Sequence, residues 1–121
     1  MALTPFGKAL RRLRIDRDML LKDMARKAAV TPAFLSAVEA GRKPIPHYLV
    51  DRIADSIGLG HSEREQLRSD AQISAASVQI GLSASSSIFD RSLAVQLARS
   101  FDGLDDGQKN AIKKIMDRRK E

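Results

Sequence analysis

Apolar residues recur at intervals of three and four along most of the chain, which is the spacing of one face of an α-helix. In the first stretch, Phe6, Leu10 and Leu13 share such a face. Thr4 supplies a helix cap before it, and Pro5 fits the first turn because its missing N–H would have no partner there. The pattern predicts a short amphipathic helix with a basic outer face.

Four further helices are predicted by the same spacing within about the first 70 residues. Three of them cover residues 20–28, 31–41 and 47–57. The fifth begins at Ser62, because Ser62 and Glu65 have the S-x-x-E spacing of a capping box. Glycines follow the third and fourth helices, where a left-handed residue commonly ends a helix.

The second half of the chain changes character at a Ser-rich run, residues 83–87, which predicts a flexible joint. Two more amphipathic helices are predicted after it, forming an αα-hairpin too small to bury its own apolar face. Their apolar stripes consist of Phe89, Leu93, Leu97, Phe101, Ile112, Ile115 and Met116. We expect these residues to form a homodimer interface or to bind another protein.

The composition agrees with an all-α protein, since 43% of the residues are hydrophobic but only 4% are aromatic, and strand signals are poor. The predicted organisation is a five-helix domain with a C-terminal helical extension. Its parts are the domain at 1–70, a helix end and Ser-rich joint at 71–87, and a dimerisation or interaction segment at 88–121.

Positive charge is concentrated in the first half of the chain. Residues 1–60 carry 11 Lys and Arg against 6 Asp and Glu, whereas residues 61–121 carry 10 against 9. An excess of this kind indicates an acidic partner for the N-terminal domain, although an ordinary solvated basic face would give the same count.

No residues have the spacing of a catalytic or metal site, so neither an enzyme nor a cofactor is predicted. The chain contains no Cys, and His47 and His61 lack a zinc-type spacing. The carboxylates within 102–107 lack the EF-hand spacing and more simply supply a turn and a helix cap. No apolar run suits a signal peptide or a membrane span, so a cytoplasmic protein without a membrane partner is expected.

The second and third predicted helices are separated only by Ala29 and Val30, which is a helix-turn-helix arrangement. Around it, the run LRRLRIDRDMLLKDMARKAAVTPAFLSAVEAGRKPIP resembles the Xre family of phage-repressor and Cro-like regulators. The resemblance covers roughly residues 6–68. It implies a five-helix domain, usually dimeric, that binds double-stranded operator DNA, with a palindromic operator matching the twofold symmetry of the dimer.

The resemblance assigns roles to individual positions. The recognition helix would face DNA through Thr31, Pro32, Ala33, Phe34, Ser36 and Ala37. Backbone phosphates would be contacted by Arg42 and Lys43, with further contributions from Lys22 and Arg11. Arg14 and Glu39 match a family pair that joins the first helix to the end of the third, which is a structural role.

The sequence departs from the family pattern in the helix-turn-helix itself. Leu20 and Leu21 stand where a Thr or Ser cap and a Gln are common, so Asp18 is the alternative cap. Ala29 replaces the usual turn glycine; if its φ is positive, the residue is strained by about 1 kcal/mol.

The third helix contains no Arg, Asn or Gln, the residues that most often discriminate bases. Its hydroxyls and small apolar groups would read thymine methyl groups and DNA shape instead. Pro32, Ala33 and Ala37 are equally ordinary helix-starting and surface residues, and Phe34 could be covered by the core. The favoured function is a dimeric repressor. The alternative is an antitoxin that binds a toxin through its C-terminal helices and represses its own promoter.

Overall fold

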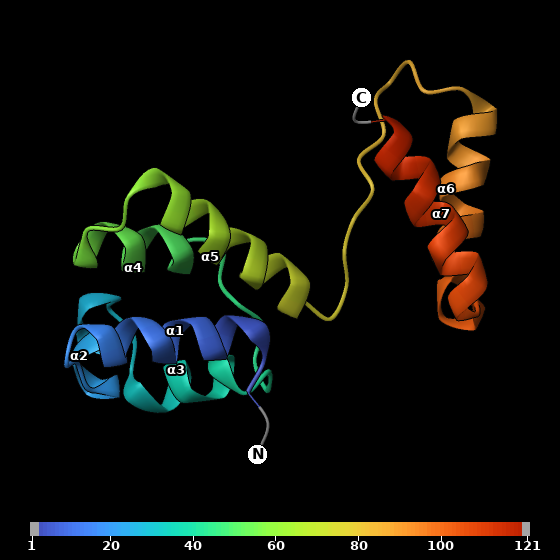
Figure 1. Ribbon diagram of the computed structural model, residues 1–121. Helices are drawn as coiled ribbons and strands as arrows, with labels where there is room; N and C mark the ends of the chain where they lie inside the picture. The colour runs from blue at the N-terminus through green and yellow to red at the C-terminus, as the bar shows by residue number, and fades with distance from the viewer. Residues whose placement is uncertain (1–2, 120–121) are drawn as a thin grey trace. The chain divides into compact units, whose positions relative to one another are not determined.

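The computed structural model describes residues 3–119, and every regular element in that range is a helix, which confirms the all-α prediction (Figure 1). Contacts divide the chain into two units, residues 1–78 and 79–121. The division falls inside the joint predicted at 71–87.

Five helices make up the first unit, as the apolar spacing predicts: α1 (Pro5–Asp16), α2 (Leu21–Lys27), α3 (Pro32–Glu39), α4 (Leu49–Ile57) and α5 (His61–Ser74). Helix α1 packs against both α3 and α5, while α2 packs against α3 and α4, and α4 against α5. Figure 1 shows α1 and α3 side by side in the lower part of this unit. The predicted helices are therefore arranged around one shared core.

That core is mainly aliphatic, as the low aromatic content indicates. Its largest fully buried side chains are Phe6, Leu10, Met24, Leu35, Leu49, Ile53 and Val38. Burial of apolar surface at about 25 cal/mol per Å² is the main stabilising contribution. These residues come from four different helices, so the helix-turn-helix is held by the whole unit rather than by its own two helices.

Helices α1 and α3 meet at a glycine that the apolar pattern does not single out. A Cβ on Gly7 would lie 2.2 Å from the carbonyl oxygen of Glu39, so only glycine permits this approach. Thr4 completes the junction: its Oγ1 accepts a hydrogen bond from Gly7 N at 3.1 Å and donates to the Glu39 carbonyl at 3.0 Å. The start of α1 is thereby fixed to the end of the α3 helix.

The start of α5 differs from the prediction. The helix begins at His61 with Gly60 as its N-cap, so Ser62 lies inside the first turn and makes no capping box with Glu65. An N-cap residue needs extended backbone, and here Gly60 has it. Buried Leu59 anchors the chain just before this point, which lets the helix begin one residue before Ser62.

The second unit contains α6 (Ile88–Ser100), a short 3₁₀ turn η1 (Phe101–Gly103) and α7 (Asp106–Arg119). Ser87 Oγ accepts from Asp90 N at 3.0 Å at the start of α6. Asp105 Oδ1 accepts from Gln108 N at 2.8 Å before α7, so the acidic turn does supply a helix cap. Within residues 79–119, no residue is buried.

Candidate DNA-binding surface

The turn between α2 and α3 contains a residue in the left-handed region. Ala29 has a φ of +58°, which is the positive value that would strain a non-glycine residue there. The turn is closed by main-chain hydrogen bonds from Ala28, Ala29 and Val30 to carbonyls of α2. Arg52 Nη1 from α4 also donates to the Ala28 carbonyl at 2.9 Å, which links the turn to α4.

Helix α3 begins and ends as its sequence predicts. Thr31 Oγ1 accepts a hydrogen bond from Phe34 N at 3.1 Å, and Pro32 occupies the first turn. Gly41 follows the helix with a φ of +78°. The first turn of α3 is exposed. Thr31, Pro32 and Ala33 are open to solvent, and Ser36 is half-buried one turn later. This set of four residues is called the reading face below.

Two residues predicted to face DNA are covered in whole or in part. Ala37 is only 8% exposed, so little of its side chain is available for contact with DNA. The chain folds back after Gly41, and the Arg42 and Lys43 amides both donate to the Ala37 carbonyl, at 2.9 and 3.3 Å. Phe34 is half-buried, because part of its side chain packs against the core.

The predicted phosphate-binding cations lie on two separate parts of the unit. Arg42 and Lys43 are exposed in the loop directly after α3, and Lys22 is exposed at the start of α2, so these three belong to the helix-turn-helix and its flank. Arg11 lies in a shallow hollow on α1 together with Lys8 and Arg12. None of Arg11, Lys22, Arg42 and Lys43 forms an ion pair within residues 3–119.

Arg14 and Glu39 form a buried pair between α1 and the last turn of α3. Arg14 Nη2 donates to Glu39 Oε1 at 3.1 Å, and Nη1 donates to Oε2. The residues are 7% and 3% exposed. Arg14 Nη1 also lies 3.5 Å from Met24 Sδ in α2, so the guanidinium touches all three of the first helices. Because the Arg14–Glu39 pair is buried among these helices, it is not part of the exposed reading face.

The start of α2 corrects another prediction. Asp18 has a φ of +49° and does not cap the helix; the N-cap is Leu20, which makes no side-chain cap hydrogen bond. Asp23 Oδ2 accepts from Leu20 N at 3.0 Å instead. An acidic residue three positions after the N-cap is a recognisable signal for this contact. Leu20 remains 59% exposed, an apolar side chain at the N-terminus of α2.

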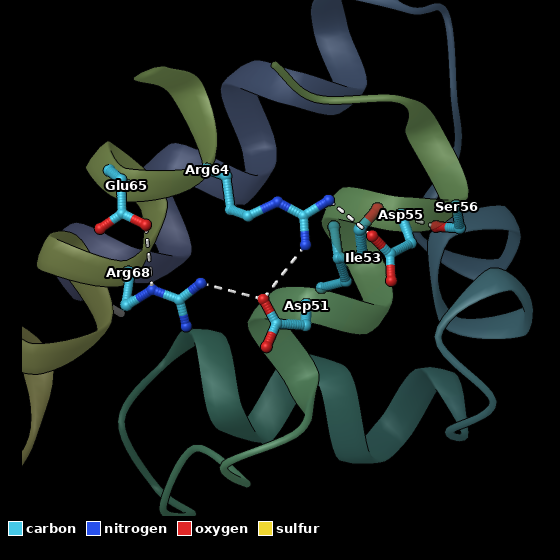
Figure 2. Close-up of polar contacts among 7 residues, drawn as sticks. All are labelled: Asp51, Ile53, Asp55, Ser56, Arg64, Glu65 and Arg68. Carbon is cyan, nitrogen blue, oxygen red and sulfur yellow. Dashed lines mark hydrogen bonds and ion pairs between the residues drawn. The ribbon is translucent and has the colours of Figure 1, made fainter. Parts of the chain in front are cut away.

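Helices α4 and α5 are joined by a charged network that the sequence did not reveal (Figure 2). Asp51 Oδ1 accepts from Arg68 at 3.0 Å and from Arg64 at 3.2 Å, and Arg64 also bonds Asp55. The hydrogen bond from Arg68, aided by that from Arg64, holds the pKa of Asp51 below its ordinary value of 3.8, although desolvation opposes the shift. The network fixes α5 on α4.

Within residues 3–119, no helix is long and apolar enough to cross a membrane. No group of three or more His, Asp or Glu side chains in the same range is placed to hold a metal ion.

Comparison with known proteins identifies one similarity. A family model described as a helix-turn-helix domain matches residues 5–67, which is more than half of the chain and runs from the start of α1 into α5. No curated protein and no solved structure matches the chain.

Proposed function

This chain belongs to the helix-turn-helix domain family, and on that premise we propose that it is an Xre-type transcriptional regulator, a repressor that binds double-stranded DNA with sequence preference. The observation that carries the proposal is the reading face at the capped start of α3, which is mostly open to solvent, with exposed Arg42 and Lys43 in the loop after the helix. In a helix-turn-helix, the first turn of the second helix is the part that enters the major groove. Repression would follow from occupancy of the operator alone.

Base reading would depend on a small set of groups. Thr31 and Ser36 offer hydroxyls that can donate or accept, and Pro32 and Ala33 offer apolar surface for thymine methyl groups. Small side chains also allow close approach of the helix to the floor of the groove. Bidentate contacts are excluded by composition, because α3 has no Arg, Asn or Gln, so part of the preference would come from DNA shape.

Affinity would come mainly from phosphate contacts. Arg42, Lys43 and Lys22 are exposed near the reading face and free of ion pairs among the described residues, so their full charge is available to DNA. Each phosphate neutralised releases counterions, which makes such binding strongly dependent on salt. Arg26 is a weaker candidate because it pairs with Asp23 at 3.1 Å.

We further propose that the second unit makes the protein a homodimer. Phe89 is 72% exposed, Leu93 54% and Ile115 60%, a large apolar exposure for two helices. A twofold dimer would present two reading faces to a palindromic operator, with half-sites about one helical turn, roughly 10 base pairs, apart or a multiple of it.

The same exposed surface supports a second candidate function, that of an antitoxin. In that case the apolar side chains of residues 88–116 would cover a toxin rather than another copy of the chain, and the first unit would repress the promoter of the pair. The observation in its favour is that no residue within 79–119 is buried, which leaves the unit available to any apolar partner.

Selection of bound sequences from random duplexes, carried out with the full chain at moderate salt, tests the proposal. We expect enrichment of a motif rich in thymine at the positions read by α3, present as two inverted half-sites. A single half-site would support DNA reading but contradict the dimer. Absence of enrichment over the starting pool would overturn sequence-specific binding.

A further inference from the structure

A cavity of about 690 Å³ lies in the first unit between the loop after α3 and the C-terminal part of α5. Its size falls within the range of about 300 to 1,000 Å³ that is usual for small-molecule sites. The loop side is formed by residues 41–47, and the other side by Arg68, Ala71, Gln72 and Ser74 of α5 together with residues 75–77 after the helix. None of the reading-face residues lines it.

The inner wall of this cavity is apolar and part of the core. Val38 is 1% exposed and Val50 5%, so both are held by the packing of α3 and α4. Ile45 and Ala71 also line the cavity and pack against the core from the loop and from α5. A wall built on core residues is largely formed before any ligand arrives, which lowers the entropy lost on binding.

The rim of the cavity carries one sign of charge. Its ionisable side chains are Arg42, Lys43, His47 and Arg68, and no Asp or Glu lines it. The charge of Arg68 is offset by Asp51 at 3.0 Å, but Arg42 and Lys43 have no ion pair within residues 3–119. Two uncompensated cations beside an apolar wall favour an anion with an apolar body.

We propose that this cavity binds a small amphipathic carboxylate, with an aryl or medium-chain alkyl body against half-buried Ile45 and Ala71 and a carboxylate head at Arg42 or Lys43. A carboxylate with an apolar body matches the site better than a polyanion, because the lining is mainly apolar and Arg42 and Lys43 are its only uncompensated Arg and Lys side chains among the described residues. A neutral apolar compound would leave the cationic rim without a partner.

Such a ligand would also act on DNA binding, a consequence that depends on the proposed function. Arg42 and Lys43 are the cations assigned to phosphate contacts, and a carboxylate bound to them would compete with DNA. The chain would then combine its reader and an effector site within one small unit, and the carboxylate would act as an inducer.

Isothermal titration of the full chain, without DNA, tests the site. The probes are octanoate and 1-naphthoate, each compared with its neutral primary amide, and inorganic phosphate as an anion without an apolar body. At least one carboxylate should bind, its amide at least tenfold more weakly, and phosphate without detectable heat. Binding of neither carboxylate at millimolar concentration, or equal binding of acid and amide, would overturn the proposal.

Two matched variants locate the site. Ala75 is exposed and lines the cavity, so Ala75→Phe fills it without entering the core. Ile73, which is 67% exposed and does not line the cavity, provides the control Ile73→Phe. Ala75→Phe should weaken carboxylate binding at least tenfold, and Ile73→Phe should not; the helical circular dichroism and melting temperature of both verify folding. An equal loss in both variants would contradict the location.

The same samples distinguish a failure here from a failure of the proposed function. Light scattering on Ala75→Phe shows whether a second copy of the chain covers the cavity. If this variant alone loses the dimer, and no carboxylate binds to the wild type, the ligand site is overturned. If the carboxylate binds but DNA affinity is unchanged at saturation, competition is wrong. DNA binding is measured separately, without ligand. Its absence would contradict the proposed regulator function and not the ligand site.

Discussion

Arg14 of α1 and Glu39 at the end of α3 are joined by two hydrogen bonds, and both residues are buried, with exposed fractions of 7% and 3%. Each ion depends on the other, since removal of one partner leaves a buried charge uncompensated. The pair therefore holds α3 at a fixed angle on α1, alongside the close approach of Gly7 to the Glu39 carbonyl.

Loss of this pair should clearly lower stability. Glu39→Ala leaves the Arg14 guanidinium buried without its carboxylate, and we expect a loss of about 3 to 5 kcal/mol in the free energy of unfolding. Thermal and urea unfolding measure it. The control Glu65→Ala removes an exposed carboxylate from α5 and should have a far smaller effect. A melting temperature for Glu39→Ala within error of the wild type would refute the structural role.

A glycine at position 29 should be neutral or stabilising. Ala29 has a φ of +58°, where an L-residue with a Cβ is strained by about 1 kcal/mol and glycine is not. Ala33→Gly is the matched control, because Ala33 lies in the first turn of α3 with ordinary helical backbone and should lose up to about 1 kcal/mol. Chemical unfolding of both variants measures these changes in the free energy of unfolding. Marked destabilisation by Ala29→Gly would show that the turn has another conformation.

The contact between α4 and α5 should depend on pH. The pKa of Asp51 is lowered by Arg68 and Arg64, so its stabilisation is present above the ordinary value of 3.8 and is lost as the pH falls through the lower folded value. Melting temperatures of wild type and Asp51→Asn should therefore differ at pH 7 and converge in acid. Asp16→Asn, which removes an exposed carboxylate from α1, is the control. A constant difference from pH 7 to pH 2 is the result that rules this out.

The apolar surface of α6 should be required for self-association. Leu93→Lys places a charge among exposed apolar side chains, whereas Gln96→Lys adds the same charge at an exposed polar position of the same helix. Light scattering should show a dimer for wild type and Gln96→Lys and a monomer for Leu93→Lys. If Leu93→Lys remains dimeric, the surface is available to another protein, as the antitoxin candidate requires.

Helix count and core could be predicted from the sequence because they depend on local spacing. The apolar period places Phe6, Leu10 and Leu35 correctly, and the caps Thr4 and Thr31 follow from side-chain chemistry alone. The positive φ at Ala29 has no local signal in the sequence; only the family resemblance, with its usual turn glycine, points to that possibility.

Features that depend on the path of the backbone in space could not be predicted in the same way. Ala37 lies in the same helix as the exposed residues of the reading face, but it is only 8% exposed, and its carbonyl accepts from the Arg42 and Lys43 amides where the chain folds back. The Gly7 contact and the Asp51 network join residues that are distant in sequence, and the cavity beside α5 has no local pattern. The predicted capping box at Ser62 does not form, because Gly60 provides the extended N-cap backbone two residues earlier than the motif implies.

The central claim, that the start of α3 reads bases while the loop after it holds phosphate, is tested most directly by titrating DNA against two variants. Fluorescence anisotropy over a series of salt concentrations compares wild type, Ser36→Ala and Lys43→Ala on the selected duplex and on a scrambled one, with Lys114→Ala in α7 as control. Lys43→Ala should weaken both duplexes alike and reduce the salt slope by about 1, whereas Ser36→Ala should reduce only the preference for the selected duplex. Equal losses on both duplexes for Ser36→Ala, with an unchanged salt slope for Lys43→Ala, would contradict the account.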